Sequence, residues 1–398
     1  MSDAETARSV QGLPSEESMV LYPSTRSMLE SQILLHDERP IIWWLEDHSL
    51  HSASYAELHD LAKQAANYLR LKETTFGQRI RLNTRNDLET VVKYWGLWLE
   101  GAILVPEKGV SSKELYALSD PFPSSGFLDL IAQQSTEYEL GQKSKLSDDA
   151  IIFTEQVNRV ITLSHNNVLS SGLANSLHLN LTCDDIVICP LSIGESLGYV
   201  AGLLTTAYVG ASLALCTPDP EQMIQMIRET NSRWMLTTPS LLSKLLEYIA
   251  FSNTEIPERL QFITLVTGLS SELAQQVINQ MGCKMITGFH SAECSSFATL
   301  LPVNLKDSDY QTLFDEKAAM PIGVELQTTE VNILNDKSSP VKEREKGELA
   351  IRGHTVMQRY EGNESETDMA FQGGWLHTKR VGYKITTDVN EVIFFIKS

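Results

Sequence analysis

The 398-residue sequence is poor in cysteine and has no paired cysteine motif. Its cysteines form an odd set without a Cys-x-x-Cys pair: Cys183, Cys189, Cys216, Cys283 and Cys294. This pattern argues against a disulfide framework and against a zinc site of the usual spacing. The first residues are acidic and lack the apolar segment of a secretory signal. We therefore expect reduced thiols and a cytoplasmic location.

Basic residues and long apolar runs are also scarce. The chain has 32 Lys and Arg against 51 Asp and Glu, a net charge of −19, so its surface repels phosphate backbones and we expect no nucleic-acid partner. The uncharged stretch 196–218 is long enough to span a bilayer. It is interrupted by Gly198, Gly202 and Gly210. The glycines predict a buried helix, a turn at Gly210 and a strand over 211–216, and no membrane span.

The remaining composition is that of a globular protein with a large core. Hydrophobic residues make up 42% of the chain, enough for two or three subdomains. Strand-like apolar runs at 41–44, 79–82 and 102–105 alternate with amphipathic helical stripes at 55–69 and 88–99. This order predicts a parallel sheet covered by helices.

Four regions follow from composition and periodicity. Residues 1–25 are polar and aperiodic, which predicts a flexible N-terminal arm. The stretch 119–147 is rich in loop residues and indicates a soft boundary, and short alternating strands follow Pro321. We therefore expect a first α/β subdomain over 26–149, a second over 150–320 and a β-rich subdomain over 321–398.

A group of motifs late in the chain carries a family resemblance. These are Gly347-Glu348-Leu349-Ala350-Ile351-Arg352-Gly353, Gly373-Gly374-Trp375-Leu376-His377-Thr378 and Val381-Gly382-Tyr383. Together they resemble the core motifs of the adenylate-forming family, which includes acyl-CoA synthetases, peptide-synthetase adenylation domains and luciferases. The resemblance covers roughly residues 26–398. It implies an α/β fold with two helix-flanked, mostly parallel sheets and a small C-terminal β-barrel-like subdomain, and an ancestry in carboxylate adenylation with ATP and Mg²⁺.

The segment that corresponds to the family's phosphate loop departs from the pattern. The family has a Gly-rich loop with a lysine between the strand ending at Thr154 and the next helix, whereas residues 155–162 contain no glycine. The segment is also about three residues shorter, and a backbone nest for phosphate needs residues that accept positive φ. Two interpretations are open: a plain connecting loop with an exposed Arg159, or a phosphate grip in which Arg159 replaces the lysine.

Other nucleotide contacts of the family are altered too. Leu265 and Val266 replace the two glycines of the adenine turn, and His290 replaces a glycine after the aromatic wall residue Phe289. Glu293 keeps the position of the family's magnesium ligand. A carboxylate without bound triphosphate is a weak magnesium site.

The ribose contact and the end of the chain complete the list of departures. The family carries Gly-Asp, whose carboxylate holds the ribose hydroxyls, where this chain has Lys379-Arg380. The resemblance further implies that the C-terminal lid with its catalytic lysine is absent. The positions left for nucleotide binding are Thr154, Arg159, Phe289, Lys379 and Arg380, and we expect ATP and Mg²⁺ binding to be weak or lost.

Three functional hypotheses remain open. The leading one is a degenerate AMP-binding domain, inactive in adenylation on its own, that binds a hydrophobic or aromatic carboxylate or a protein partner, such as a lid-bearing or carrier protein in acyl or secondary metabolism. The second is an active ligase that borrows a lid from another chain and grips phosphate with Arg159 and Lys379. The third is a repurposed enzyme using His290, Glu293 and Cys294, because His and Cys four residues apart can face each other on a helical turn.

Overall fold

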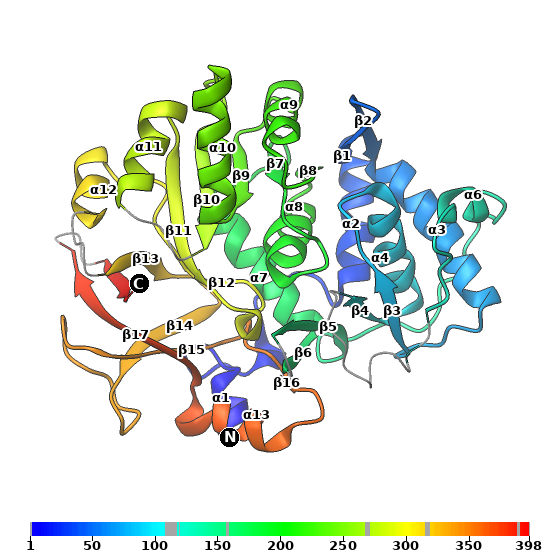
Figure 1. The fold of residues 1–398 in the computed structure, drawn as a ribbon. Coiled ribbons are helices and arrows are strands. Elements are labelled where there is room, and N and C mark those ends of the chain that lie inside the picture. Colours follow the sequence, from blue (N-terminus) through cyan, green and yellow to red (C-terminus); the bar gives the residue numbers. More distant parts are fainter. Residues whose placement is uncertain are drawn as a thin grey trace.

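The computed structural model describes residues 2–107, 118, 120–156, 159–266, 271–314, 319–387 and 391–397. These residues form two β-sheets flanked by helices (Figure 1). The predicted α/β class is confirmed, and the predicted strands and helices correspond closely to those observed. The arrangement of the sheets places the ends of β6, β11 and β17 around one cavity.

The smaller sheet has the strand order β16-β6-β5-β4-β3. Its strands are β3 (Arg79–Asn83), β4 (Ile103–Glu107), β5 (Asp149–Gln156), β6 (Arg159–Ser164) and β16 (Arg359–Tyr360). Helices α3 (Tyr55–Leu71) and α4 (Leu88–Glu100) lie beside it (Figure 1). A capping box begins α3, since the Ser54 hydroxyl accepts from the Glu57 backbone amide while the Glu57 carboxylate accepts from the Ser54 backbone amide. Gly101 ends α4 at φ 68°.

The larger sheet has thirteen strands in the order β14-β15-β17-β18-β13-β12-β11-β10-β9-β7-β8-β1-β2. They are β1 (Pro40–Glu46), β2 (Ser49–Ser54), β7 (Ile186–Cys189), β8 (Ser212–Leu215), β9 (Trp234–Thr237), β10 (Phe262–Val266), β11 (Lys284–His290), β12 (Phe297–Leu300), β13 (Met320–Glu325), β14 (Thr329–Leu334), β15 (Gly347–Gly353), β17 (Leu376–Thr386) and β18 (Val392–Ile396). Parallel pairing joins β10 to β9 and β11, whereas the strands from β12 onward pair antiparallel. The late strands therefore extend the edge of the large sheet.

Helices cover these sheets and fill the connections. They are α1 (Asp3–Ala7), α2 (Thr25–His36), α6 (Phe127–Ile131), α7 (His165–His178), α8 (Thr205–Tyr208), α9 (Pro220–Thr230), α10 (Pro239–Ser252), α11 (Ser271–Met281), α12 (Asp307–Phe314) and α13 (Glu364–Ala370). Figure 1 shows α9 to α12 along one side of the large sheet. Short 3₁₀ turns at Ser15–Glu17, Ala292–Cys294 and Gln372–Gly374 complete the helical elements.

The sheets cut across the expected subdomain boundaries. The strand expected over 41–44 does not join the strands at 79–82 and 102–105; as β1 it pairs with β8 in the large sheet. Strand β5, placed by sequence at the start of a second subdomain, pairs with β4 in the small sheet. An apolar strand pattern identifies a buried strand but not its neighbour, which depends on packing between distant segments.

The uncharged stretch 196–218 folds as predicted. A π-helical segment, Leu197–Leu204, continues into α8, Gly210 turns the chain at φ 74°, and β8 follows. A Cβ at Gly210 would lie 2.2 Å from the His36 ring, so the turn requires glycine for space as well as for backbone angle. Within the described residues, no helix combines the length and apolar character needed to cross a membrane.

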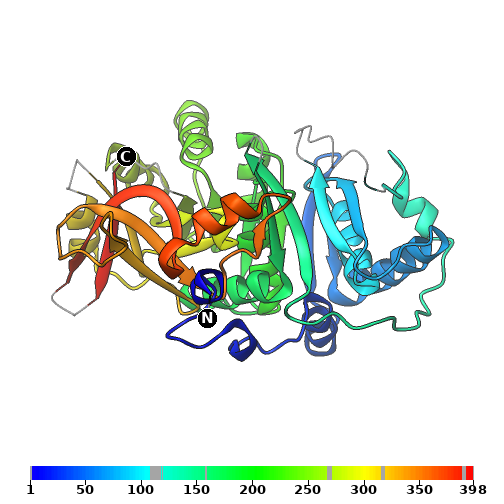
Figure 2. The same cartoon turned by 90° about the horizontal axis from the view of Figure 1, so that it is seen from below.

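The N-terminal segment packs against the body of the protein, which differs from the expected flexible arm. The Arg8 guanidinium donates to the Gln358 carbonyl at 2.8 Å, and the Gly373 amide donates to the Asp3 carboxylate at 2.9 Å. Figure 2 shows the N-terminal helix beside the chain around α13. The polar character that suggests disorder is here satisfied by partners more than 300 residues away, which a local pattern does not reveal.

Candidate functional site

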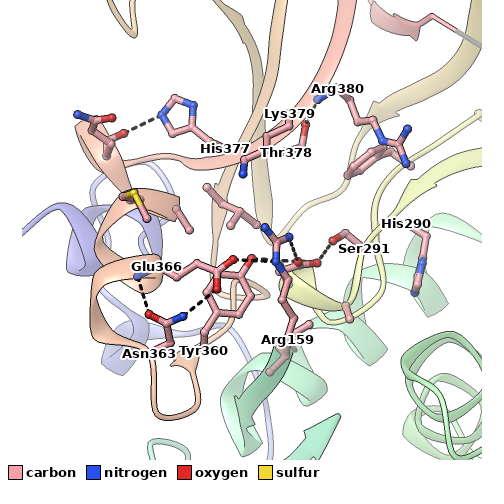
Figure 3. A pocket seen from close by; sticks show the side chains of 18 residues that line it. Arg159, His290, Ser291, Tyr360, Asn363, Glu366, His377, Thr378, Lys379 and Arg380 are labelled. Atoms are coloured by element: carbon pink, nitrogen blue, oxygen red, sulfur yellow. Dashed lines mark hydrogen bonds and ion pairs between the residues drawn. The ribbon is translucent and has the colours of Figure 1, made fainter. Parts of the chain in front are cut away.

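A cavity of about 550 Å³ lies where the ends of several strands meet. Its lining comes from β6, from the end of β11 and the turn after it, from the segment 360–372 that contains α13, and from residues 376–380 of β17. Figure 3 shows Arg159, Tyr360 and Glu366 on one side and Lys379 and Arg380 on the other. The cavity collects six of the eight site residues named from the sequence: Arg159, Phe289, His290, Glu293, Lys379 and Arg380.

The segment that corresponds to the phosphate loop is a tight β-hairpin. Thr154 pairs with Val160 and Gln156 pairs with Arg159, so only residues 157 and 158 lie between the paired strands. The backbone groups of paired strands are directed at each other, so the described residues of the hairpin, up to 156 and from 159 onward, offer no open row of amides for phosphate. Thr154 is buried, its hydroxyl has no hydrogen-bond partner within the described part of the chain, and it does not line the cavity.

Arg159 is the centre of an internal charge network. Its Nε donates to Glu366 Oε1 at 2.8 Å, and its Nη1 lies 3.5 Å from Glu293 Oε1. Its guanidinium also lies over the Tyr360 ring, 5.2 Å from the ring centroid. Burial by itself lowers the pKa of Arg159, but the neighbouring Tyr360, Glu366 and Glu293 outweigh it and raise the pKa overall. Arg159 is thus a fixed cation that two carboxylates already neutralise.

Besides its contact with Arg159, Glu293 accepts hydrogen bonds from two hydroxyl groups. The Tyr360 hydroxyl donates to Glu293 Oε1 at 3.0 Å, and the Ser291 hydroxyl donates to Oε2. Burial, together with the Glu293 carboxylate, raises the pKa of the Tyr360 phenol, which therefore stays a donor. Glu293 is 9% exposed. Both of its oxygens are used within the protein, and no group of three or more His, Cys, Asp or Glu side chains among the described residues is arranged to hold a metal ion.

His290 and Cys294 do not share a helical turn, contrary to the geometry expected for a repurposed site. His290 is the last residue of β11, and its Nε2 lies 3.0 Å from the Ser196 hydroxyl. Cys294 ends the short 3₁₀ turn and points to the Ser291 and Ser296 carbonyl oxygens, 3.2 Å from each. Burial raises the pKa of the Cys294 thiol to about 12. A protonated, fully buried thiol is a poor nucleophile.

Lys379 and Arg380 project from a bulge in β17. Ala350 pairs with His377 and Glu348 pairs with Val381, so three residues of β17 oppose the single residue Leu349. Glu348 fixes the bulge: one carboxylate oxygen accepts from the Lys379 amide at 2.6 Å, and the other lies 2.9 Å from His377 Nδ1. Lys379 itself takes φ 59°.

Sequence reasoning missed the residues that complete the network. Glu366 is the third residue of α13. Asn363 caps this helix, because its side-chain oxygen accepts from the Glu366 backbone amide, and its side-chain NH₂ donates to the Glu366 carboxylate at 3.0 Å. The Asn-x-x-Glu spacing was therefore a usable signal for a helix start. Nothing local indicated that Arg159 meets Glu366 and Tyr360, since they are about 200 residues apart in the chain. The side chains of Leu265 and Val266 and all of residues 267–270, the altered adenine turn, lie outside what the structure describes.

A family model and several curated proteins match about half of the chain. A family model described as AMP-binding enzyme matches residues 160–361. The chain is 26% identical over 226 residues to the medium-chain acyl-CoA ligase ACSF2, mitochondrial, of Bos taurus, which covers 54% of this chain and 35% of that protein. It is 24% identical over 234 residues to the medium-chain fatty-acid–CoA ligase of Escherichia coli (strain K12), covering 58% of this chain and 40% of that one.

Structural similarity extends over nearly the whole chain. The crystal structure of the anthranilate CoA ligase AuaEII in complex with anthranoyl-AMP superposes with a TM-score of 0.81 at 17% identity, covering 96% of this chain and 78% of that one. At this identity the similarity shows the fold alone. The matched regions span two-fifths or less of the two curated relatives. Because the family model covers just over half of the 398 residues, the chain belongs to the AMP-binding enzyme family.

Proposed function

We propose that this chain binds a hydrophobic or aromatic carboxylate in the cavity and does not adenylate it on its own. The observation that carries the proposal is the closed network around Glu293, whose two oxygens accept hydrogen bonds from Tyr360 and Ser291 beside the Arg159 cation. A site prepared for Mg²⁺ and triphosphate would leave this carboxylate available to the metal and this cation available to phosphate.

The charge network opposes Mg-ATP for an energetic reason. Mg²⁺ requires oxygen ligands at about 2.0–2.1 Å in near-octahedral geometry. To coordinate Glu293 it would have to displace Arg159, and the guanidinium would then stay close to a divalent cation. Phosphate binding by Arg159 would in turn separate it from Glu366, its partner at 2.8 Å. The nucleotide must therefore break an existing ion-pair network before it gains any contact.

The cavity itself suits a small organic acid. Its volume of about 550 Å³ lies within the range of small-molecule sites. Ile161, Phe289 and Leu376 supply apolar wall, and Met369, 64% exposed, lies at the edge. The relatives described above are named as CoA ligases for medium-chain acyl, medium-chain fatty-acid and anthranilate substrates. The corresponding acids all have an apolar or aromatic body.

Calorimetric titration with octanoate and with benzoate tests the proposal. We expect saturable binding of at least one of these acids without nucleotide. The variant Ala370→Trp should abolish it, because Ala370 lines the cavity and an indole would fill much of the space. Ala250→Trp is the matched control, since Ala250 is exposed on α10 and lines no part of this cavity.

Two results would contradict the proposal. One is the absence of binding for both acids. The other is carboxylate-dependent ATP–pyrophosphate exchange by the purified chain, which would show that the network around Glu293 opens for nucleotide. A protein-partner role belongs with the first of these results: neither acid binds, and the chain forms a stable complex that Ala370→Trp leaves intact.

A further inference from the structure

We propose that the Lys379–Arg380 bulge is an oxyanion subsite that holds the acidic group of the ligand. The inference rests on the proposed function for the apolar body of the ligand, while the charged group is assigned from the bulge itself. Both side chains line the cavity, and both residues are exposed. The shared chemistry of the group they would hold is that of a carboxylate or a phosphate monoester.

The charge balance of the cavity distinguishes these two cations from Arg159. Arg159 is compensated by Glu293 and Glu366. Within the described residues, neither the Lys379 ammonium nor the Arg380 guanidinium has a carboxylate within ion-pair distance. The cavity thus carries three cationic side chains against two carboxylates in a chain whose net charge is −19. Two adjacent uncompensated cations at a concave site favour an anionic ligand.

The bulge is a braced feature of the backbone. The nearby carboxylate of Glu348 is occupied by the Lys379 amide and by His377, and the second ring nitrogen of His377 lies 2.9 Å from the Gln372 carbonyl oxygen. The Thr378 hydroxyl donates to the Leu349 carbonyl at 2.6 Å and accepts from the Arg380 amide at 3.2 Å. Side chains on a braced bulge lose less freedom on binding than those on a loose loop.

Lys379 adopts an uncommon backbone conformation to reach this position. Its φ of 59° lies in the left-handed region, which costs a non-glycine residue roughly 1 kcal/mol or more. The family pattern has glycine at this position, for which the same conformation carries no such penalty. A lysine is therefore kept where glycine would relieve strain, and its neighbour is an arginine where the pattern has an aspartate. Both changes add positive charge at the cavity.

The placement of the cavity wall indicates how a ligand would lie. Leu376 precedes the bulge in the same strand, and Ile161 and Phe289 line the cavity from other strands. An acid with its oxyanion at Lys379 and Arg380 would direct its apolar body along these side chains. The Arg159 end, where one cation already faces two carboxylates, would lie beside the uncharged part of the ligand.

The double variant Lys379→Gln/Arg380→Gln tests this assignment. Octanoate and octyl phosphate are titrated into wild type and variant at fixed ionic strength. We expect octanoate to bind about tenfold more weakly to the variant, and octyl phosphate to lose more because it carries the larger charge. The matched control is Lys244→Gln/Lys342→Gln, which removes two exposed cations that do not line the cavity. It should bind both probes as the wild type does.

A charge-reversing variant provides a second test of the subsite. Lys379→Gly/Arg380→Asp relieves the positive φ and places a carboxylate at the subsite, so it should fold at least as well as wild type and bind neither probe measurably. Circular dichroism and a melting curve establish that each variant is folded. The relative loss of octanoate and of octyl phosphate identifies which oxyanion the subsite prefers.

The outcomes separate this inference from the proposed function. If wild type binds octanoate and the Gln double variant binds it equally well, or the control loses as much, the subsite assignment is wrong while the carboxylate proposal stands. If the chain shows ATP–pyrophosphate exchange yet the Gln double variant still loses octanoate, the proposed function fails and the subsite stands. Absence of binding of both probes to wild type overturns both.

Discussion

Replacing Arg159 with alanine is expected to lower the free energy of unfolding by about 2 kcal/mol at neutral pH. The change removes the cation between Glu293 and Glu366 and leaves two carboxylates at one cavity without a compensating charge. The uncompensated charge on Glu293 should cost more stability than the charge on Glu366, because Glu293 is more deeply buried. The figure is below that of a fully buried pair, because the Arg159 side chain is 26% exposed. Urea denaturation of wild type and variant measures the difference.

A second variant shows whether the loss comes from the uncompensated charge. In Arg159→Ala/Glu293→Gln the more buried carboxylate is neutral, and the Gln side-chain oxygen still accepts from the Tyr360 hydroxyl. We expect the double variant to recover part of the stability that the single variant loses. Equal stability of the single variant and wild type would show that the network contributes nothing, and the central objection to Mg-ATP binding would then lose its basis.

Replacing Gly323 with alanine is expected to destabilise the protein by about 3 kcal/mol or more. Gly323 has φ +85°, and a Cβ there would lie 2.0 Å from the carbonyl carbon and oxygen of Leu300. The backbone has little room to move, because β13 pairs with β12 at Val324 and with β18 at Gly323 itself. Glycine is thus required at position 323, where β13 joins β12 to β18 in the large sheet.

Gly362→Ala is the matched control for this substitution. Gly362 also has positive φ, 69°, but a Cβ there meets no atom within 4 Å. Gly362→Ala should therefore lower the free energy of unfolding only by the cost of the left-handed backbone conformation, about 1 kcal/mol. If the two alanine variants melted at the same temperature, the close approach of Leu300 to Gly323 would not be a determinant of stability.

Much of the fold was accessible from the sequence because it depends on local patterns. The helical stripe over 55–69, the break at Gly210 and the strand after it each follow from residues a few positions apart. Sheet membership was not accessible in this way. The strand pattern of β1 gives no sign that its neighbour is β8, about 170 residues later.

For the candidate site, too, single residues could be named from local sequence, whereas their contacts with distant segments could not. The absence of glycine from 155 to 162 predicts a segment unsuited to phosphate, but the hairpin of β5 and β6 observed at this position was not predicted. The sequence pointed to Glu293 and Arg159 separately. Their ion pair, and the hydrogen bond from Tyr360 that completes it, arise only when three distant segments meet. His290 and Cys294 do not lie on one helical turn, because β11 ends at His290 and the short 3₁₀ turn begins only at Ala292.

The most direct test of this account is calorimetric titration of the purified chain with Mg-ATP, with the melting temperature as a second readout. The account predicts no binding heat and no shift at millimolar Mg-ATP, because Glu293 and Arg159 are already engaged with each other and with Tyr360, Ser291 and Glu366. Micromolar binding, which at a hundredfold excess over Kd would stabilise the fold by about 2.7 kcal/mol, would contradict it. The network would then have to be regarded as a closed state that nucleotide opens.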